Sequence, residues 1–191
     1  MRDQDGITMA IRNILGVDDP SLRKNSRTVT EFNKRLHTLL DDMRETLIAA
    51  NGLGLAAPQV GVLRRAVLIV DTNIESEDPQ DQIVEMVNPE IMASSGEQSG
   101  SEGCLSLPGV YGLVNRPSLV KVKAQDRNGK TFELWVKQLT ARAVCHEIDH
   151  LNGVIFISLT DHILSEEELE QLAAGRESQS EERNEQEVQA E

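Results

Sequence analysis

The sequence predicts an α+β fold in which short, mostly antiparallel strands pack with two principal helices. Apolar residues recur at helical spacing near residues 30 to 50 and again at 138 to 151. Two further stretches alternate polar and apolar residues on either side of Asn128-Gly129, which is typical of a β-hairpin. A chain of 191 residues with 39% hydrophobic content is long enough for one domain with its own core.

The first helix is predicted to start after Thr30, which has the side chain of an N-cap, and to stop at Asn51-Gly52. One apolar stripe marks its buried face: Phe32, Leu36, Leu39, Leu40, Met43 and Leu47. The Gly- and Ala-rich residues 52 to 61 are expected to form a loop.

Three segments are predicted between this loop and the middle of the chain. The branched run at 65 to 70 indicates a buried strand, and residues 71 to 82 a polar surface loop. Residues 84 to 87 are expected to form a short strand that ends in a turn at Asn88-Pro89.

The second half begins with residues 94 to 103, rich in Ser and Gly, which are expected to be a flexible approach to Cys104. Residues 120 to 124 and 132 to 136 form the predicted hairpin. The second helix covers 138 to 151, and "GVIFISL" at 153 to 159 is predicted to be a strand.

Four segments follow from this pattern. Residues 1 to 8 precede the apolar pattern as an N-terminal extension, and 9 to 164 are predicted to be the catalytic domain. Ser165 and Glu168 form a capping box for a short C-terminal helix over 165 to 174. Residues 175 to 191 are Glu-, Gln- and Ser-rich with little to bury, so we expect an acidic disordered tail.

The charge of the chain is uneven. Residues 165 to 191 carry ten Glu against Arg176 and Arg183, and so account for −8 of the net charge of −13. This charge and the scarcity of aromatic residues argue against direct nucleic-acid binding. The chain has only two cysteines, no apolar leader and no apolar run that could span a bilayer. We therefore expect a cytoplasmic protein without membrane contact.

The most informative motif is "HEIDH" at residues 146 to 150. His146 and His150 are four residues apart and so lie on one face of a helix, where two neutral imidazoles can hold a divalent ion beside Glu147. Cys145 projects about 100° away from His146 and is expected to be buried and apolar. The third ligand could therefore be Cys104, Asp161 or His162.

A second candidate lies at Gln59, an amide at the end of the Gly- and Ala-rich stretch. Gly54 and its small neighbours would let a substrate approach the backbone there. An HxxxH pair alone is often structural, but the pair, its intervening Glu, the Gly-flanked Cys104 and Gln59 together favour an active site.

Three stretches in order, "GLGLAAPQ" (52 to 59), "EGCLS" (102 to 106) and "HEIDH" (146 to 150), resemble the signature motifs of bacterial peptide deformylase. The similarity extends from about Met9 to about Leu159. It implies short strands packed around a central helix that carries HEIDH. It also implies hydrolytic removal of the formyl group from formyl-methionine of newly made polypeptides, with release of formate.

The resemblance also implies residue roles. Cys104, His146 and His150 would bind the metal, and Glu147 would be the general acid/base for a metal-activated hydroxide. Gln59 and the backbone N–H of Leu105 would stabilise the oxyanion.

Further residues are expected to support the site. The resemblance implies that Glu102 and Arg116 pair and brace the Cys104 segment, while Asp149 is expected to accept hydrogen bonds that fix the helix or a ligand. Apolar residues that could form a slot for the methionine side chain are Leu53, Leu105 and Ala143.

Metal and ribosome contacts are the remaining expectations. The ligand types alone suit Zn²⁺, whereas the resemblance favours Fe²⁺, with Zn²⁺, Ni²⁺ or Co²⁺ able to bind. Family members act on nascent chains at the ribosome, some through a basic C-terminal helix. The acidic tail here would be repelled by ribosomal RNA, so we expect it to be a dispensable solubilising segment.

Two competing functions are a zincin endopeptidase and a nonenzymatic metal-binding protein. The former would cleave internal peptide bonds and use Asp161 or His162 as a ligand. The latter would bind an ion without turnover, against which Glu147 and Gln59 argue.

Overall fold

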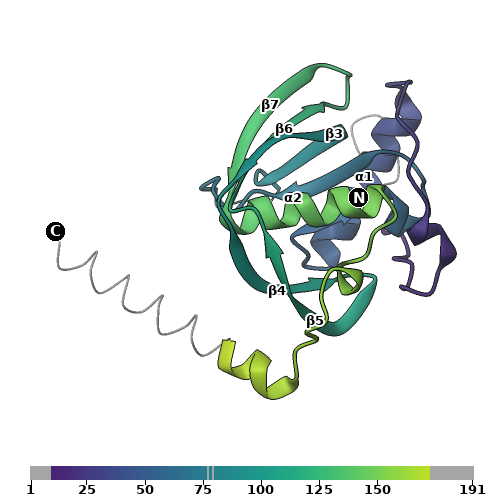
Figure 1. Cartoon of the computed structure of the whole chain (residues 1–191). Helices are drawn as coiled ribbons and strands as arrows, with labels where there is room; N and C mark the ends of the chain where they lie inside the picture. Colours follow the sequence, from purple (N-terminus) through teal and green to yellow (C-terminus); the bar gives the residue numbers. More distant parts are fainter. Residues whose placement is uncertain (1–9, 77, 79, 173–191) are drawn as a thin grey trace.

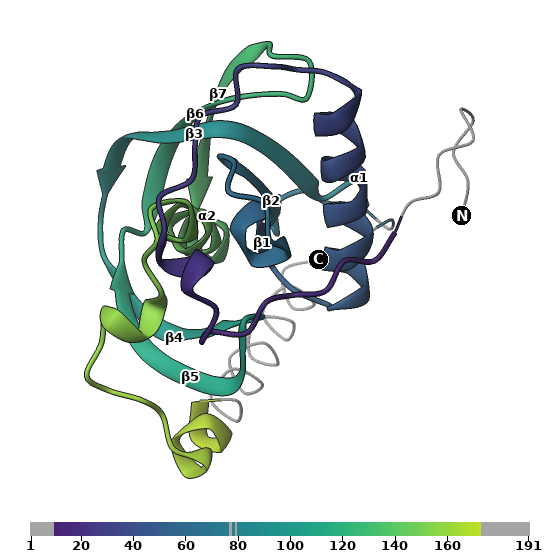
Figure 2. The ribbon, with the colours of Figure 1, turned by 90° about the vertical axis from the view of Figure 1, so that its right-hand side faces the viewer.

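The structure is a computed structural model that describes residues 10–76, 78 and 80–172. Helix α2 (Gln138–Leu151) runs through the middle of the molecule, with a five-stranded sheet on one side and a two-stranded sheet on the other (Figure 1). Helix α1 (Lys34–Ala49) lies on the outside of the larger sheet (Figure 2). This is the predicted α+β fold.

The larger sheet is antiparallel throughout, in the order β1-β2-β3-β6-β7. Its strands are β1 (Gly54–Ala56), β2 (Ala66–Val70), β3 (Ile83–Ser95), β6 (Leu119–Gln125) and β7 (Thr131–Lys137). The predicted hairpin is confirmed as β6 and β7, with Val120 opposite Val136. Gly129 has φ +84° in the turn, a conformation that favours glycine.

The predicted turn at Asn88-Pro89 is wrong, because β3 continues through it. Asn88 has φ +52°, and the pairing with β6 shifts register between Val87 and Glu90. The Asn88 side chain bonds the backbone of Val29 through both its oxygen (2.8 Å) and its nitrogen (2.9 Å). A side chain that ties a bulge to a distant segment explains why a turn signal occurs inside a strand.

The segment at 94 to 103 is also ordered, contrary to the predicted flexible approach. β3 ends at Ser95, Gly96 turns the chain with φ +66°, and β4 (Gln98–Cys104) pairs with β5 (Leu107–Arg116). The Ser- and Gly-rich composition hides this strand, because cross-strand pairing and not an apolar period holds it in place.

Helix α1 begins later than predicted. Its N-cap is Asn33, not Thr30, and the Asn33 side chain accepts hydrogen bonds from the backbone N–H groups of Arg35 and Leu36. The apolar stripe is buried as expected within the helix, with Leu40 and Met43 fully inaccessible, whereas Phe32 precedes the helix and is only partly buried.

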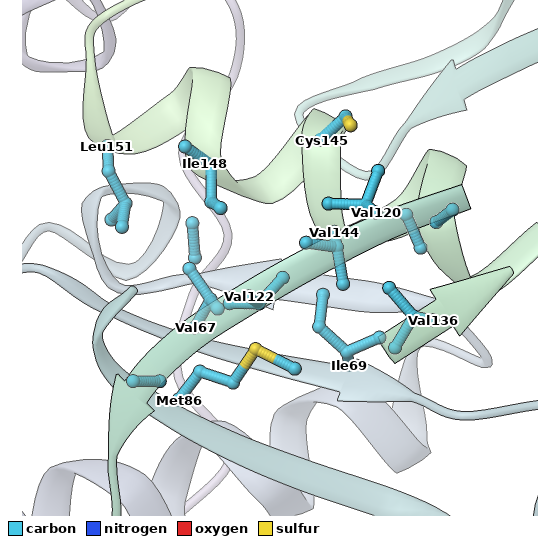
Figure 3. Close-up of a cluster of buried hydrophobic side chains, with 14 residues drawn as sticks. Val67, Ile69, Met86, Val120, Val122, Val136, Val144, Cys145, Ile148 and Leu151 are labelled. Atoms are coloured by element: carbon cyan, nitrogen blue, oxygen red, sulfur yellow. The ribbon is translucent and has the colours of Figure 1, made fainter. Parts of the chain in front are cut away.

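Helix α2 has the predicted bounds, and one of its faces closes the core. Val144, Ile148 and Leu151 pack on the inner side of the sheet (Figure 3). The strand residues labelled in that cluster are Val67, Ile69, Met86, Val120, Val122 and Val136. Burial of this face fixes the helix in rotation and turns His146 and His150 toward the smaller sheet.

The predicted strand at 153 to 159 is wrong. Its residues form an irregular segment with the 3-10 turn η3 (Phe156–Ser158) after Gly153, which has φ +72°. Ile155 and Phe156 are nevertheless buried, in a cluster with Cys104 and Val114. The apolar run therefore reflects burial alone, without strand pairing.

The C-terminal capping box is confirmed. The backbone N–H and hydroxyl of Ser165 donate to Glu168 at 2.8 and 2.9 Å, and residues 166 to 172 are helical. The predicted extension at 1 to 8, the end of the helix at 173 and 174, and the tail at 175 to 191 lie outside the described residues. No helix within the described ranges is long and apolar enough to cross a membrane.

Candidate metal centre and active site

Three side chains, one from β4 and two from α2, come together where the strand approaches the helix. Cys104 is the last residue of β4, and His146 and His150 lie one turn apart on α2. Their ligand atoms all lie within 4.8 Å of one another, and all three residues are buried. The Cys104 Sγ is 3.2 Å from the His150 Nε2.

This separation fits two ligands of one ion. A sulfur and a nitrogen bound tetrahedrally at about 2.3 and 2.0 Å would be about 3.5 Å apart. A thiolate with two imidazoles is a donor set that suits divalent transition metals.

The electrostatic environment differs between the two histidines. Burial opposes a charge on His146, but hydrogen bonds to Cys104 and Glu102 outweigh it and raise its pKa to about 10. Burial lowers the pKa of His150 to about 3, which keeps that imidazole neutral. Because a metal ligand must be a neutral imidazole, an ion that binds here has to displace a proton from His146, whereas His150 already has a free lone pair.

The other candidate ligands lie elsewhere. His162 is exposed and bonds Glu168 at 2.7 Å, and Asp161 is also exposed. Cys145 is 5% exposed and packs in the core between α2 and the sheet. Of the candidates for the third ligand, only Cys104 approaches the two histidines.

Glu147 is buried beside the histidines, and its Oε2 has no hydrogen-bond partner among the described residues. Burial raises its pKa to about 7, although the nearby His146 lowers it somewhat. Gly54 of β1 packs directly on this side chain. The absence of a side chain at Gly54 thus makes room for Glu147.

Gln59 lies in η2 (Ala57–Val60), and the expected loop at 52 to 61 instead comprises β1 and this 3-10 turn. The Gln59 Oε1 accepts a hydrogen bond from the Ala56 backbone N–H at 2.8 Å. This fixes the amide, so that its Nε2 donates to the Ser106 hydroxyl at 3.2 Å and to the Cys104 Sγ at 3.5 Å. Ser106 was not expected from the sequence.

Glu102 connects the smaller sheet to α2. Its carboxylate accepts hydrogen bonds from Arg116 at 2.8 and 2.9 Å and lies 3.1 Å from the His146 Nδ1. Arg116 also donates to Asp149 at 2.6 Å. Burial alone would raise the pKa of Glu102, but the bonds from Arg116 and His146 prevail and lower it to about 2.

Arg142 is a residue of this network that sequence analysis missed. Its Nη1 lies 2.9 Å from the Glu102 Oε1. The available signal was its position, since a residue one turn before His146 shares the face of the helix that carries the ligands.

A cavity of about 510 Å³ opens over the ligands. Leu53, Leu105 and Ala143 line it together with Gly54, and further apolar walls come from Tyr111 and Leu139. The cavity thus joins an apolar wall to a polar floor that contains Cys104, His146 and Glu147. It suits a substrate with an apolar side chain next to a carbonyl group.

Fold and site together are those of a metal-dependent hydrolase. Residues 11–166 match the model of the polypeptide deformylase family. Peptide deformylase of Caldicellulosiruptor bescii is 52% identical over 163 residues, which cover 85% of this chain and 93% of that protein. Peptide deformylase 1 of Bacillus subtilis is 47% identical over 161 residues, which cover 84% of this chain and 97% of that protein.

Solved structures agree with the sequence comparisons. A peptide deformylase from Legionella pneumophila superimposes with a TM-score of 0.73 at 42% identity, covering 92% of this chain and 98% of its own. A peptide deformylase from Thermotoga maritima gives a TM-score of 0.73 at 35% identity, covering 79% of this chain and 98% of its own. The chain belongs to the polypeptide deformylase family.

Proposed function

We propose that this chain hydrolyses the formamide bond of N-formyl-methionyl polypeptides at a centre formed by Cys104, His146 and His150. As a member of its family, the chain is a metal-dependent hydrolase that removes the formyl group from newly made polypeptides. The approach of the Cys104 Sγ to within 3.2 Å of His150, beside a buried Glu147 with a free oxygen, is the observation that carries the proposal.

Cys104, His146 and His150 would hold a divalent ion, which would supply a Lewis acid for the formyl carbonyl and lower the pKa of water from 15.7 toward about 7. We favour Fe²⁺ as the ion in the cell, on the family resemblance. Zn²⁺, Ni²⁺ and Co²⁺ suit the same donors.

Glu147 acts as the general acid/base. An ion at the centre would lower this raised pKa, so that the carboxylate would be ionised and could accept a proton from water. Its Oε2 makes no competing hydrogen bond with the described residues, and so it is free to hold this proton and pass it to the leaving amine.

Gln59 and the backbone N–H of Leu105 stabilise the oxyanion that forms from the formyl oxygen. The bond from Ala56 to the Gln59 Oε1 orients the amide before the substrate arrives, and its Nε2 exchanges one of its present partners, Cys104 or Ser106, for the oxyanion. Each donor contributes about 3 kcal/mol, or roughly a hundredfold in rate.

The methionine side chain packs against the apolar wall of the cavity. Leu53, Leu105 and Ala143 contact it there, and Gly54 leaves the backbone open to the peptide. A relative from Acinetobacter baumannii, 32% identical and with a TM-score of 0.72, has been solved with Met-Ala-Ser bound. A peptide that begins with methionine is the expected product of deformylation.

The remaining proposals concern the chain as a whole. Residues 9 to 164 form the catalytic domain of a cytoplasmic enzyme, with 1 to 8 and 165 to 174 as appendages. Any contact with the ribosome is transient and does not use the acidic residues 175 to 191, which ribosomal RNA repels.

Formate release from formyl-Met-Ala peptides tests this function. We expect release that stops with an iron chelator, and loss of release in Glu147→Ala with the metal retained. Cleavage of internal peptide bonds instead would indicate an endopeptidase, and a bound ion without turnover would indicate a nonenzymatic protein.

A further inference from the structure

Arg142 is a buried cation on α2 whose side-chain hydrogen bonds all go to the smaller sheet. Arg142 has a relative solvent exposure of 6%, and it lies on α2 one turn before His146. Its guanidinium crosses from the helix to the smaller sheet, β4 and β5. This sheet carries Cys104, and the helix carries the other two ligands.

Both strands of the smaller sheet bond to this guanidinium. Its Nη1 donates to the backbone carbonyls of Val114 at 2.9 Å and Gly100 at 3.2 Å, and its Nη2 donates to Gln98 O at 3.2 Å. A Cβ at Gly100 would lie 3.1 Å from the Nη2, so a glycine is suited to this approach. Arg142 therefore attaches the β4–β5 pair to the helix at three backbone positions.

A fourth contact joins Arg142 to a neighbour of the ligands. Arg142 and His146 hold the two oxygens of the same carboxylate, because Nη1 is 2.9 Å from the Glu102 Oε1 and Nδ1 is 3.1 Å from Oε2. Glu102 precedes Cys104 by two residues on β4. Two groups one helical turn apart thus fix both the position and the rotation of Glu102.

Arg116 makes the reciprocal connection. It lies on β5 and donates to Asp149 of α2, so it crosses the interface in the opposite direction. Arg116 holds Glu102 from the same sheet on which Glu102 lies, whereas Arg142 holds it from the helix. Removal of Arg142 would leave Glu102 paired but would release β4 from the helix at Gln98 and Gly100.

We propose that Arg142 is a positioning residue that sets the distance between the Cys104 sulfur and the two imidazoles, and thereby how firmly the metal is held. The inference rests on the proposed metal centre. Through Glu102 it also fixes His146 with its Nδ1 occupied, so that the Nε2 lone pair points to the ion. Arg142 lines the cavity, but its hydrogen bonds go to Glu102 and to backbone carbonyls and not to Cys104, His146 or His150.

The test measures metal retention directly. Full-length protein loaded with Co²⁺ is mixed with excess EDTA, and the loss of the visible cobalt absorption is followed in Arg142→Met and Arg142→Lys. We expect release about 10 to 100 times faster in Arg142→Met, the usual effect of removing a group that orients ligands. The cobalt absorption bands should also shift, because the sulfur–metal geometry changes.

Arg142→Lys covers the case in which the methionine variant does not fold. A lysine keeps the charge but cannot donate to three carbonyls at once, so an intermediate release rate is expected. Release at the wild-type rate from either variant would overturn the proposal.

Arg127→Met is the matched control. Arg127 is also a partly buried arginine that bridges carboxylates, those of Glu85 and Asp41, but it lies in the turn between β6 and β7. We expect a lower melting temperature without faster Co²⁺ release. Equal acceleration in both variants would mean that Arg142 only stabilises the fold, whereas a wild-type protein that binds no Co²⁺ would refute the proposed metal centre itself.

Discussion

Gly54 and Glu147 are in direct contact: a Cβ built on Gly54 would lie 2.5 Å from the Glu147 Oε1 and 2.7 Å from its Cγ. No side chain can be added there unless Glu147 moves. A displacement of the proposed general acid/base by about 1 Å can cost roughly a hundredfold in rate.

Gly54→Ala should therefore lower kcat by about a hundredfold while the metal content stays unchanged. Overpacking should also cost about 1 to 3 kcal/mol of stability. Gly16→Ala is the control, because a Cβ at Gly16 would meet nothing within 4 Å. An unchanged kcat in Gly54→Ala would show that the position of Glu147 does not limit the reaction.

The two cysteines should differ in their effect on metal binding. Cys104→Ala removes the thiolate and should abolish stoichiometric binding of the ion and formate release, as measured by metal analysis and turnover. Cys145→Ala, in the core on the opposite side of the helix, should keep both. Metal and activity retained in Cys104→Ala would exclude the proposed ligand set.

The Gln59 amide should affect the chemical step more than binding. Gln59→Ala should reduce kcat by about a hundredfold with the metal retained and a smaller change in KM. Gln125→Ala removes another hydrogen-bonded amide, which contacts Asn88 and Gly129 away from the site, and should leave kcat unchanged. Equal losses in both variants would contradict the role of Gln59 as an oxyanion donor.

Glu85 should make stability depend on pH. Burial would raise its pKa, but hydrogen bonds from Arg127 and Arg44 prevail and lower it from its usual 4.5. Ionised Glu85 therefore stabilises the fold above about pH 4.5, and this contribution is lost as the pH falls through the lowered folded pKa.

Glu85→Gln should accordingly lower the free energy of unfolding by about 1 to 3 kcal/mol at pH 7. The difference from the wild type should shrink below pH 4.5 in urea titrations. Glu133→Gln, in an exposed pair with Lys121, should have little effect at any pH. A constant difference for Glu85→Gln across this range would argue against the ionic origin.

Truncation after Ala174 should leave turnover of a formyl-Met peptide unchanged. It removes the acidic residues 175 to 191 but keeps the capping box of Ser165 and Glu168. The comparison is with the full chain at the same metal content. A large loss of activity would show that the acidic segment takes part in catalysis or folding.

Periodicity predicted those elements that bury one face against the core. The helix at Gln138–Leu151 and the hairpin of β6 and β7 were predicted closely. Their apolar residues recur with a period of about 3.6 residues in the helix and of 2 residues in the strands. The strand β4 and the bulge at Asn88 were not, because pairing and a tertiary hydrogen bond define them.

The same distinction holds at the site. The spacing of His146 and His150 shows two imidazoles on one face of a helix, since that relationship is local. Their meeting with Cys104 could be proposed only from chemical preference and the family motifs. The contacts of Arg142 depend on how α2 crosses β4 and β5, which no local pattern encodes.

Cys104 ends β4, and Leu107 begins β5 directly opposite it, so only Leu105 and Ser106 connect the two strands. The backbone N–H of Val17 donates a hydrogen bond of 2.8 Å to the Ser106 carbonyl in this connection. The metal ligand, the proposed oxyanion N–H and the hydroxyl that meets Gln59 are thus packed into three consecutive residues. An insertion of even one residue here would displace all three groups together, whereas the polar residues 71 to 82 take no part in the lining of the cavity.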